Sequence, residues 1–240
     1  MYFKKYTIHF LLQLSGQVLI YTAIQIIYLA MPFLQSLTDW LQQQSWLELT
    51  GVATGLICVY LAAINNIWNW PFAIVNTAIY IFIFAEAALY ADMGQNAYLL
   101  AINIYGWYYW SRQPIDAPKV PVVRINRKQI VILLAVAALI TPALGLLLVH
   151  LAPILHYQPA AYPYLDSFCT VVSLTAQVFM ARKILENWLI WIFVDIIYVG
   201  IYLSKGLQPT AFMFAVYACI ALKGYLDWRN AYRQRLHDSV

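Results

Sequence analysis

An internal duplication constrains this chain more than any other feature of its sequence. Residues 65–110 return without a gap as residues 183–228, at a fixed offset of 118 positions. The shared positions are Asn69 and Trp70 with Asn187 and Trp188, Tyr80 with Tyr198, Leu89 with Leu207, Gly106 with Gly224, and Trp110 with Trp228. Similarity at a fixed period indicates a duplicated structural unit. In a helical membrane protein, such a unit favours transport through a site between the two halves.

The composition is that of a membrane protein. Hydrophobic residues make up 63% of the chain and charged residues 10%, whereas soluble domains have about 45–50% and about 25%. Residues 6–38, 49–85 and 129–165 contain no Asp, Glu, Lys or Arg. These stretches do not alternate with period two, so they predict helices and not the strands of a membrane barrel. We therefore expect an all-α integral membrane protein.

Eight segments are candidate membrane spans, since a span needs about 20 mostly apolar residues. They are 7–30, 47–64, 70–89, 93–110, 130–150, 165–181, 188–203 and 209–226. The first is too long for the apolar core of a signal peptide, and no small-x-small cleavage site follows it, so we expect an uncleaved helix. The eight segments leave no room for a separate soluble domain.

The duplication divides the chain into two three-helix repeats, 46–112 and 164–230. Three spans are an odd number, so the extra helix at 130–150 restores the chain direction before the second repeat. The two repeats are therefore expected to be parallel, related by an axis along the membrane normal. The other parts are an N-terminal accessory helix with its outer loop (1–45), a linker region that includes the extra helix (113–163), and a cytoplasmic tail (231–240).

The basic residues predict the orientation. With the N-terminus in the cytoplasm, thirteen of the fourteen Lys and Arg residues fall on cytoplasmic segments, and Lys205 alone falls outside. This distribution follows the positive-inside rule, so both termini are expected to be cytoplasmic. The basic segment 119–128 is then a topology signal and not a nucleic-acid-binding patch. We expect a lipid bilayer as partner and no nucleic acid.

Polar residues inside a bilayer are costly and usually face the interior of a helix bundle. Segment 188–203 carries one continuous stripe at steps of three and four: Trp188, Trp191, Asp195, Tyr198 and Tyr202. Shorter stripes are Asn69, Asn76 and Tyr80; Asn96, Asn103 and Trp110; and Asp166, Thr170, Ser173 and Gln177. These faces are expected to line the interior.

Asp195, Asn76 and Asn103 share a depth as well as an inward face. At about 1.5 Å rise per residue, each lies roughly 10–12 Å from the cytoplasmic end of its helix. A lone membrane Asn is often an interhelical hydrogen-bond partner, and a Trp near a membrane face is often an interface anchor. Asp195 is harder to explain structurally, because a buried acid costs about 2.5–3.5 kcal/mol. No Lys or Arg lies at its depth, and an acid beside aromatic rings suits a cationic ligand.

The sequence lacks the motifs of several other functions. Its four His residues show no metal-ligand spacing, and its three Cys residues occur singly. There is no H-E-x-x-H, G-x-S-x-G or Walker motif. We therefore expect no metal, no cofactor, no enzymatic activity and no transport driven by ATP hydrolysis.

Four segments resemble the PnuC family of bacterial vitamin transporters. They are Trp46 to Leu56; Asn69, Trp70 and Asn76; Asn103 to Trp107 with Trp110; and Asp166 leading to Arg182, Lys183 and Glu186 to Trp191. The Asn-Ile-Tyr-Gly-Trp and Glu-Asn-Trp-x-x-Trp elements are the most specific of these. The resemblance covers residues 46 to 230.

The resemblance implies a fold similar to SWEET-type transporters and a homotrimer in the bacterial inner membrane. It implies facilitated diffusion of nicotinamide riboside, which a cytoplasmic kinase then traps by phosphorylation. It also implies that Trp188 and Trp191 line the site. The chain has Asp195 where a typical member has Asn, and Asp195 suits thiamine, also a cation with an aromatic ring, equally well. The candidate substrate-binding set is Trp188, Trp191, Asp195, Asn76, Asn103, Gln177, Tyr80, Tyr198, Asn69 and Asn187.

Overall fold

The computed structural model describes residues 21–22, 24–25, 27–28, 31–86, 90–112, 121–154 and 162–238. Within them the named elements are all helices, which confirms the all-α expectation. They are α2 (Trp46–Ala63), α3 (Asn69–Glu86), α4 (Tyr90–Ser111), α5 (Arg127–Ile154), α6 (Pro163–Ala181), α7 (Asn187–Ser204) and α8 (Gln208–Asp238). Five are long and apolar enough to cross a membrane: α2, α5, α6, α7 and α8. Helices α3 and α4 are not among these five.

Local sequence sets where two of these helices begin. At the start of α2, Ser45 and Glu48 form a capping box: Glu48 N donates to Ser45 Oγ at 3.2 Å, and Ser45 N donates to Glu48 Oε2 at 2.6 Å. Helix α6 begins at Pro163, where the missing N–H of proline costs no intrahelical bond.

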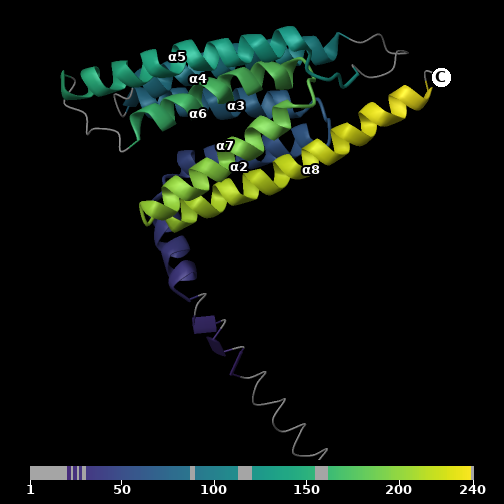
Figure 1. Ribbon diagram of the computed structural model, residues 1–240. Helices are drawn as coiled ribbons and strands as arrows, with labels where there is room; N and C mark the ends of the chain where they lie inside the picture. Colours follow the sequence, from purple (N-terminus) through teal and green to yellow (C-terminus); the bar gives the residue numbers. More distant parts are fainter. Residues whose placement is uncertain are drawn as a thin grey trace, which may run out of the picture.

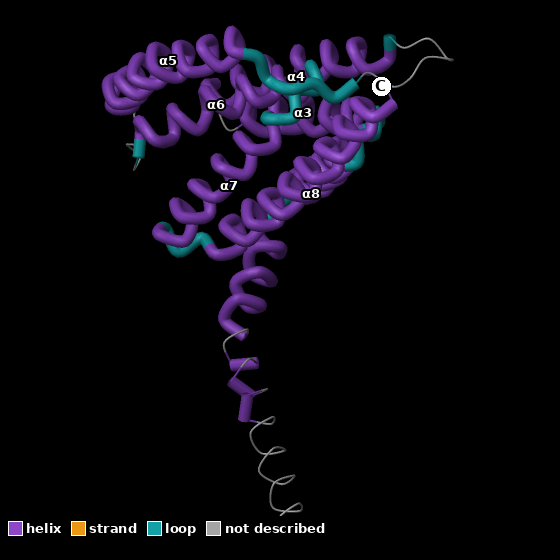
Figure 2. Tube along the Cα trace, turned by 45° about the vertical axis from the view of Figure 1, so that its right-hand side comes forward, coloured by secondary structure: helices purple, strands orange, loops and turns teal. Residues whose placement is uncertain are grey.

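The structure corrects two of the predicted boundaries. Residues 31–43, expected as an outer loop, are helical and project away from the bundle (Figures 1 and 2). This segment is rich in Leu and Gln, which are good helix formers, and its only Pro is at its second residue. Helix α8 continues past the apolar stretch 209–226 to Asp238. Most of the predicted span 7–30 lies outside the described residues.

The packing of the helices follows the duplication. Helices α2, α3 and α4 pack in sequence, as do α6, α7 and α8, and α5 packs beside α6 (Figure 1). The two sets meet through α2 against α8 and α4 against α6. These two contacts are equivalent under the offset of 118, because α2 corresponds to α6 and α4 to α8. The sets are therefore related by an approximate twofold arrangement.

Single residues repeat the same relation. Asn65 and Lys183 have positive φ, at 55° and 54°. Asn69 Nδ2 donates to Asn66 O at 2.7 Å, and its counterpart Asn187 Nδ2 donates to Ile184 O at 2.6 Å. The duplicated sequence thus produces duplicated helix–helix turns.

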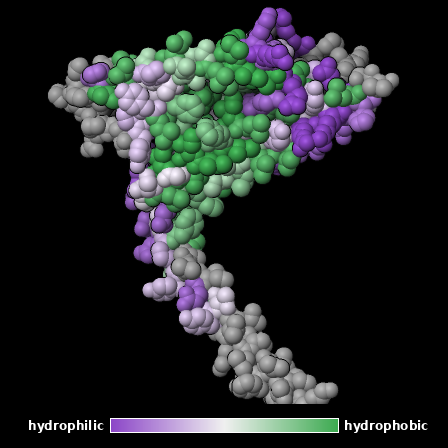
Figure 3. All heavy atoms as spheres, viewed as in Figure 1, coloured by the Kyte–Doolittle hydropathy of each residue, from purple (hydrophilic) through white to green (hydrophobic). Residues whose placement is uncertain are grey.

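The surface fits a bilayer. Apolar side chains cover the visible face of the bundle, and hydrophilic ones gather where α8 ends and α5 begins (Figure 3). We call this hydrophilic end of the bundle the linker end and define it by residues 121–126 and the turns 64–68 and 182–186.

Candidate functional site

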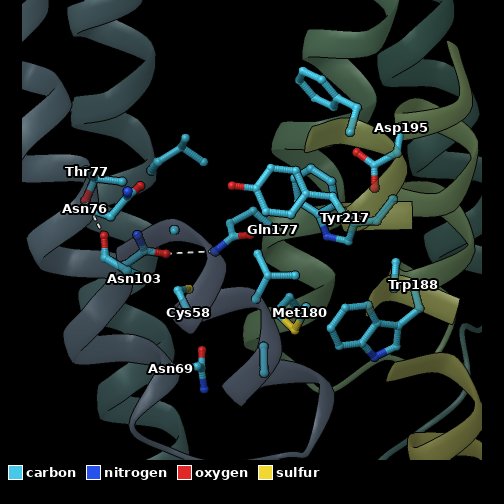
Figure 4. Close-up of a pocket in the computed structure, with 18 residues that line it drawn as sticks. Cys58, Asn69, Asn76, Thr77, Asn103, Gln177, Met180, Trp188, Asp195 and Tyr217 are labelled. Atoms are coloured by element: carbon cyan, nitrogen blue, oxygen red, sulfur yellow. Dashed lines mark hydrogen bonds between the residues drawn. The ribbon is translucent and has the colours of Figure 1, made fainter. Parts of the chain in front are cut away.

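A cavity of about 260 Å³ lies between the two repeats. Its lining comes from both three-helix sets and excludes α5 (Figure 4). The lining residues are Gly55, Cys58, Val59, Ala62, Asn69, Ala73, Asn76, Thr77, Leu99, Asn103, Gln177, Met180, Trp188, Trp191, Asp195, Phe214, Tyr217 and Ala221. The volume is close to the lower end of small-molecule sites, which is about 300 Å³.

Twelve of these lining residues form six pairs related by the offset of 118. The pairs are Val59 and Gln177, Ala62 and Met180, Ala73 and Trp191, Thr77 and Asp195, Leu99 and Tyr217, and Asn103 and Ala221. The cavity therefore lies where the two repeats face each other. In every pair except Ala62 and Met180, one member is aromatic or more polar than the other. The duplicated scaffold thus holds an asymmetric site, with its acid and all four of its aromatic lining residues on the second repeat.

Asp195 is the only ionisable carboxylate or base among the lining residues that the structure describes. It is 5% exposed, and its carboxylate lies at the cavity wall on α7 (Figure 4). Within the described residues no hydrogen bond or ion pair reaches it. A buried charge without a partner is unfavourable, so the carboxylate is suited to a ligand that carries a positive charge.

The opposite wall presents amide groups. Gln177 Nε2 on α6 donates to Asn103 Oδ1 on α4 at 2.7 Å, a bond that joins the two repeats (Figure 4). Asn76 Nδ2 donates to Gly51 O at 2.6 Å and lies 3.2 Å from Thr54 Oγ1. These bonds leave Gln177 Oε1 and Asn103 Nδ2 without a protein partner in the described structure. An acceptor and a donor are therefore available for the hydroxyl groups of a ligand.

Four tryptophans close the cavity toward the linker end. Trp70 packs edge-on against Trp110 at 5.3 Å between ring centroids, and Trp188 packs in the same way against Trp228 at 5.5 Å. The pairs meet through Trp110 and Trp228 at 5.9 Å. Trp188, which is 1% exposed, belongs to this layer and also lines the cavity.

Hydrogen bonds across the repeats fix this layer. Trp110 Nε1 donates to Ala181 O, and Trp228 Nε1 donates to Ala62 O, both at 3.1 Å. Lys183 Nζ lies 4.0 Å from the Trp110 ring centroid, within the range of a cation–π contact. The layer is a packed barrier between the cavity and the linker end.

The structure brings seven of the ten candidate residues to the cavity: Asn69, Asn76, Asn103, Gln177, Trp188, Trp191 and Asp195. Tyr80, Tyr198 and Asn187 are not in the lining. The Tyr198 ring packs against Tyr202 and Phe214, with centroids at 6.1 and 4.9 Å. Tyr80 stacks on Phe84 at 5.7 Å. The Asn187 amide donates to a carbonyl of the turn that precedes α7.

Several lining residues were absent from the sequence-based set, Tyr217, Phe214 and Thr77 among them. The repeat offset was a usable signal for some, because Thr77 is the counterpart of Asp195. Gly55 explains how Tyr217 enters the site. A Cβ there would lie 3.2 Å from the Tyr217 hydroxyl and 3.3 Å from Asn76 Nδ2, so glycine lets both side chains approach α2.

Comparison with known proteins points to one family. Residues 45–230 match the family described as "Nicotinamide mononucleotide transporter". The chain is 35% identical over 214 residues to the nicotinamide riboside transporter PnuC of Escherichia coli (strain K12), covering 80% of this chain and 88% of that protein. It is 29% identical over 185 residues to the riboflavin/roseoflavin transporter RibM of Streptomyces davaonensis, covering 76% and 84%. A crystal structure of the vitamin B3 transporter PnuC has the same fold, with a TM-score of 0.61 and 22% identity over 88% of this chain and 92% of that one.

Proposed function

Because the chain belongs to the nicotinamide mononucleotide transporter family, we propose that it takes up nicotinamide riboside across the bacterial inner membrane through the cavity between its repeats. The observation that carries this proposal is the unpaired Asp195 carboxylate facing a wall of amide groups. Nicotinamide riboside has a positively charged aromatic ring at one end and a hydroxyl-bearing ribose at the other. The two walls of the cavity match these two ends.

In the proposed complex, the pyridinium ring lies beside Asp195. Trp191 and Tyr217 supply aromatic faces for stacking and cation–π attraction, which contributes about 0.5–2 kcal/mol per ring. Trp188 forms the floor. The ribose hydroxyls bond to Asn103 and Gln177, which line the cavity and each keep an amide atom without a protein partner in the described structure.

The charge of the lining favours a nucleoside over its phosphorylated form. The described lining contains one carboxylate and neither Lys nor Arg. A phosphate monoester carries up to two negative charges and needs basic or N–H donors, so its burial here would place like charges together. Thiamine, a cation without a phosphate, remains the alternative substrate, because Asp195 suits any cationic ring.

Facilitated diffusion is the mechanism that fits the sequence, since it contains no nucleotide-binding motif. The two repeats would alternately open the cavity to either side of the membrane, with the tryptophan layer as the barrier on the linker end. A cytoplasmic kinase would trap the product by phosphorylation. The working unit is proposed to be a homotrimer with both termini in the cytoplasm.

We expect purified protein in liposomes to take up nicotinamide riboside without any other protein or ATP. Vesicles with equal concentrations inside and outside should exchange labelled substrate without net accumulation. Protein-free vesicles serve as the control, with thiamine and nicotinamide mononucleotide as competitors. Uphill accumulation driven by a proton or sodium gradient would contradict uniport. Stronger competition by thiamine than by unlabelled nicotinamide riboside would make thiamine the substrate.

We expect Trp191→Ala to weaken nicotinamide riboside binding by about 1–3 kcal/mol, because the ring supplies both packing and cation–π attraction. Calorimetry on purified protein measures this change. Phe193→Ala is the matched control, since Phe193 lies on the same helix but is 52% exposed and outside the cavity. Equal affinities of Trp191→Ala and Phe193→Ala for nicotinamide riboside would show that Trp191 is not part of the binding site.

We expect a cysteine at position 128 to react with a membrane-impermeant thiol reagent only after intact cells are permeabilised. Lys128 is exposed near the start of α5, at the linker end, which the positive-inside rule places in the cytoplasm. The variant is made in a background without Cys58, Cys169 and Cys219. A cysteine at position 205 is the control and should react from outside. Reaction of position 128 in intact cells would reverse the topology.

A further inference from the structure

A second cavity, of about 400 Å³, lies at the linker end and is separate from the cavity between the repeats. Its lining is rich in guanidinium and phenol groups. The lining residues are Arg124, Leu185, Tyr225, Arg229, Tyr232, Arg233 and Leu236. None of these residues lines the first cavity. We call it the arginine pocket.

Two parts of the chain that are distant in sequence build the arginine pocket. One wall is a single face of α8 that begins at the end of its apolar stretch, where Tyr225, Arg229, Tyr232 and Leu236 recur at steps of three and four. The other wall is the linker segment 121–126 with the turn before α7. Figure 1 shows the end of α8 running toward this segment.

Backbone hydrogen bonds hold the linker wall in place. Val123 N donates to Lys183 O at 2.9 Å, and Leu185 N donates to Val123 O at 2.8 Å. Glu186 adds a clamp, because its Oε2 accepts from Ile125 N at 2.7 Å and its Oε1 accepts from Arg124 Nε at 2.8 Å. Arg124 is therefore positioned by fixed structure, although its side chain is 61% exposed.

The charges around the pocket do not balance. Glu186 uses one oxygen on Arg124 and the other on the backbone. Asp227, the nearest acid on α8 in sequence, is paired with Lys223. Within the described residues, Arg229 and Arg233 have no acidic partner. Three guanidinium groups therefore surround the pocket with one carboxylate to offset them.

The positive-inside rule explains why basic residues are at this end of the protein. It does not require arginines from two separate segments to converge on one cavity that two tyrosines also line. Arginine presents a planar set of donors that matches phosphate oxygens, and the tyrosines can add hydroxyl donors or a stacking surface.

We propose that the arginine pocket binds a phosphate ester, either the headgroup of an anionic lipid or a soluble nucleoside monophosphate. Arg229 and Arg233 would contact the phosphate from α8, with Arg124 facing them from the linker. An occupant would join α8 to the turn that leads into α7 and so stabilise the folded protein. This proposal goes beyond the transport function and is tested by binding alone.

The test compares two probes on the wild type and two variants. Calorimetry in neutral detergent measures binding of adenosine monophosphate, with adenosine as the phosphate-free control. Thermal unfolding in nanodiscs compares phosphatidylcholine alone with phosphatidylcholine plus phosphatidylglycerol. The double variant with Arg229→Gln and Arg233→Gln should bind about tenfold or more weakly to whichever probe the wild type binds. Arg235→Gln lies on the same helix but outside the pocket, so its affinity for that probe should stay within about twofold of the wild-type value.

Each outcome has a defined meaning. Binding of adenosine monophosphate that the double variant loses would support a soluble ligand. Stabilisation by phosphatidylglycerol alone, lost in the same variant, would support a lipid. No response to either probe, or equal losses in the double variant and Arg235→Gln, would overturn the proposal. Retained binding of nicotinamide riboside shows that the double variant is folded. If the double variant does not fold, the single variant Arg233→Gln takes its place in the test.

Discussion

Asp195→Asn should weaken the binding of nicotinamide riboside about tenfold to a hundredfold while leaving its reduced, uncharged form nearly unaffected. The carboxylate is buried at the cavity wall and has no partner in the described structure. Its attraction for a cationic ring is therefore only weakly screened. Asparagine keeps the shape and the hydrogen-bonding capacity, so the neutral ligand loses little.

Calorimetry with both ligands on both proteins gives the comparison. Asp166→Asn is the control, since it removes an acid near the start of α6 that does not line the cavity. If Asp195→Asn binds the cation as tightly as the wild type, the carboxylate charge does not contribute to binding and the charge argument fails. The aromatic stacking could survive that result, because it does not depend on the carboxylate.

Gly106→Ala should destabilise the folded protein by about 1–3 kcal/mol, the usual cost of forcing extra atoms into a packed core. A Cβ at position 106 would lie 2.4–2.6 Å from three carbons of the Trp70 ring. Trp70 is fully buried and cannot move without disturbing Trp110. The glycine therefore permits the close approach of α3 and α4 on which the tryptophan layer depends.

Thermal unfolding in detergent measures this effect. Gly94→Ala is the matched control on the same helix, because a Cβ there meets nothing within 4 Å; its stability should be unchanged or slightly higher. Gly224→Ala, the repeat counterpart, should behave like Gly106→Ala, since its Cβ would lie 2.7–2.8 Å from the Trp188 ring. Equal melting temperatures for Gly106→Ala and Gly94→Ala would contradict the packing argument.

Much of the fold was predictable because hydropathy marks the apolar part of each helix. It could not show that α8 continues to Asp238, since a helix in water needs no apolar run. It also gave no sign that residues 31–43 are helical, because Gln, Ser, Thr and Asp interrupt the apolar residues of that segment. The repeat was the better guide, since positions that it relates have the same local structure, as the turns at Asn65 and Lys183 do.

The candidate site was predictable where depth and helical face agreed, as they do for Asp195, Asn76 and Asn103. The stripe on α7 also included Tyr198, but helix packing places that ring against Phe214. The periodicity of a sequence predicts which face of a helix points inward. Which residues of that face reach the cavity depends on how the neighbouring helices pack. The bond between Gln177 and Asn103 joins residues from different repeats, and no local pattern contains it.

Determining the structure of the protein with nicotinamide riboside bound would test the central claim most directly. The account predicts ligand density in the cavity between the repeats, with the pyridinium ring beside Asp195 and Trp191 and the ribose facing Asn103 and Gln177. Density in the same cavity with the two ends exchanged would contradict the assignment of the charged and amide walls. Density outside this cavity would contradict the site itself.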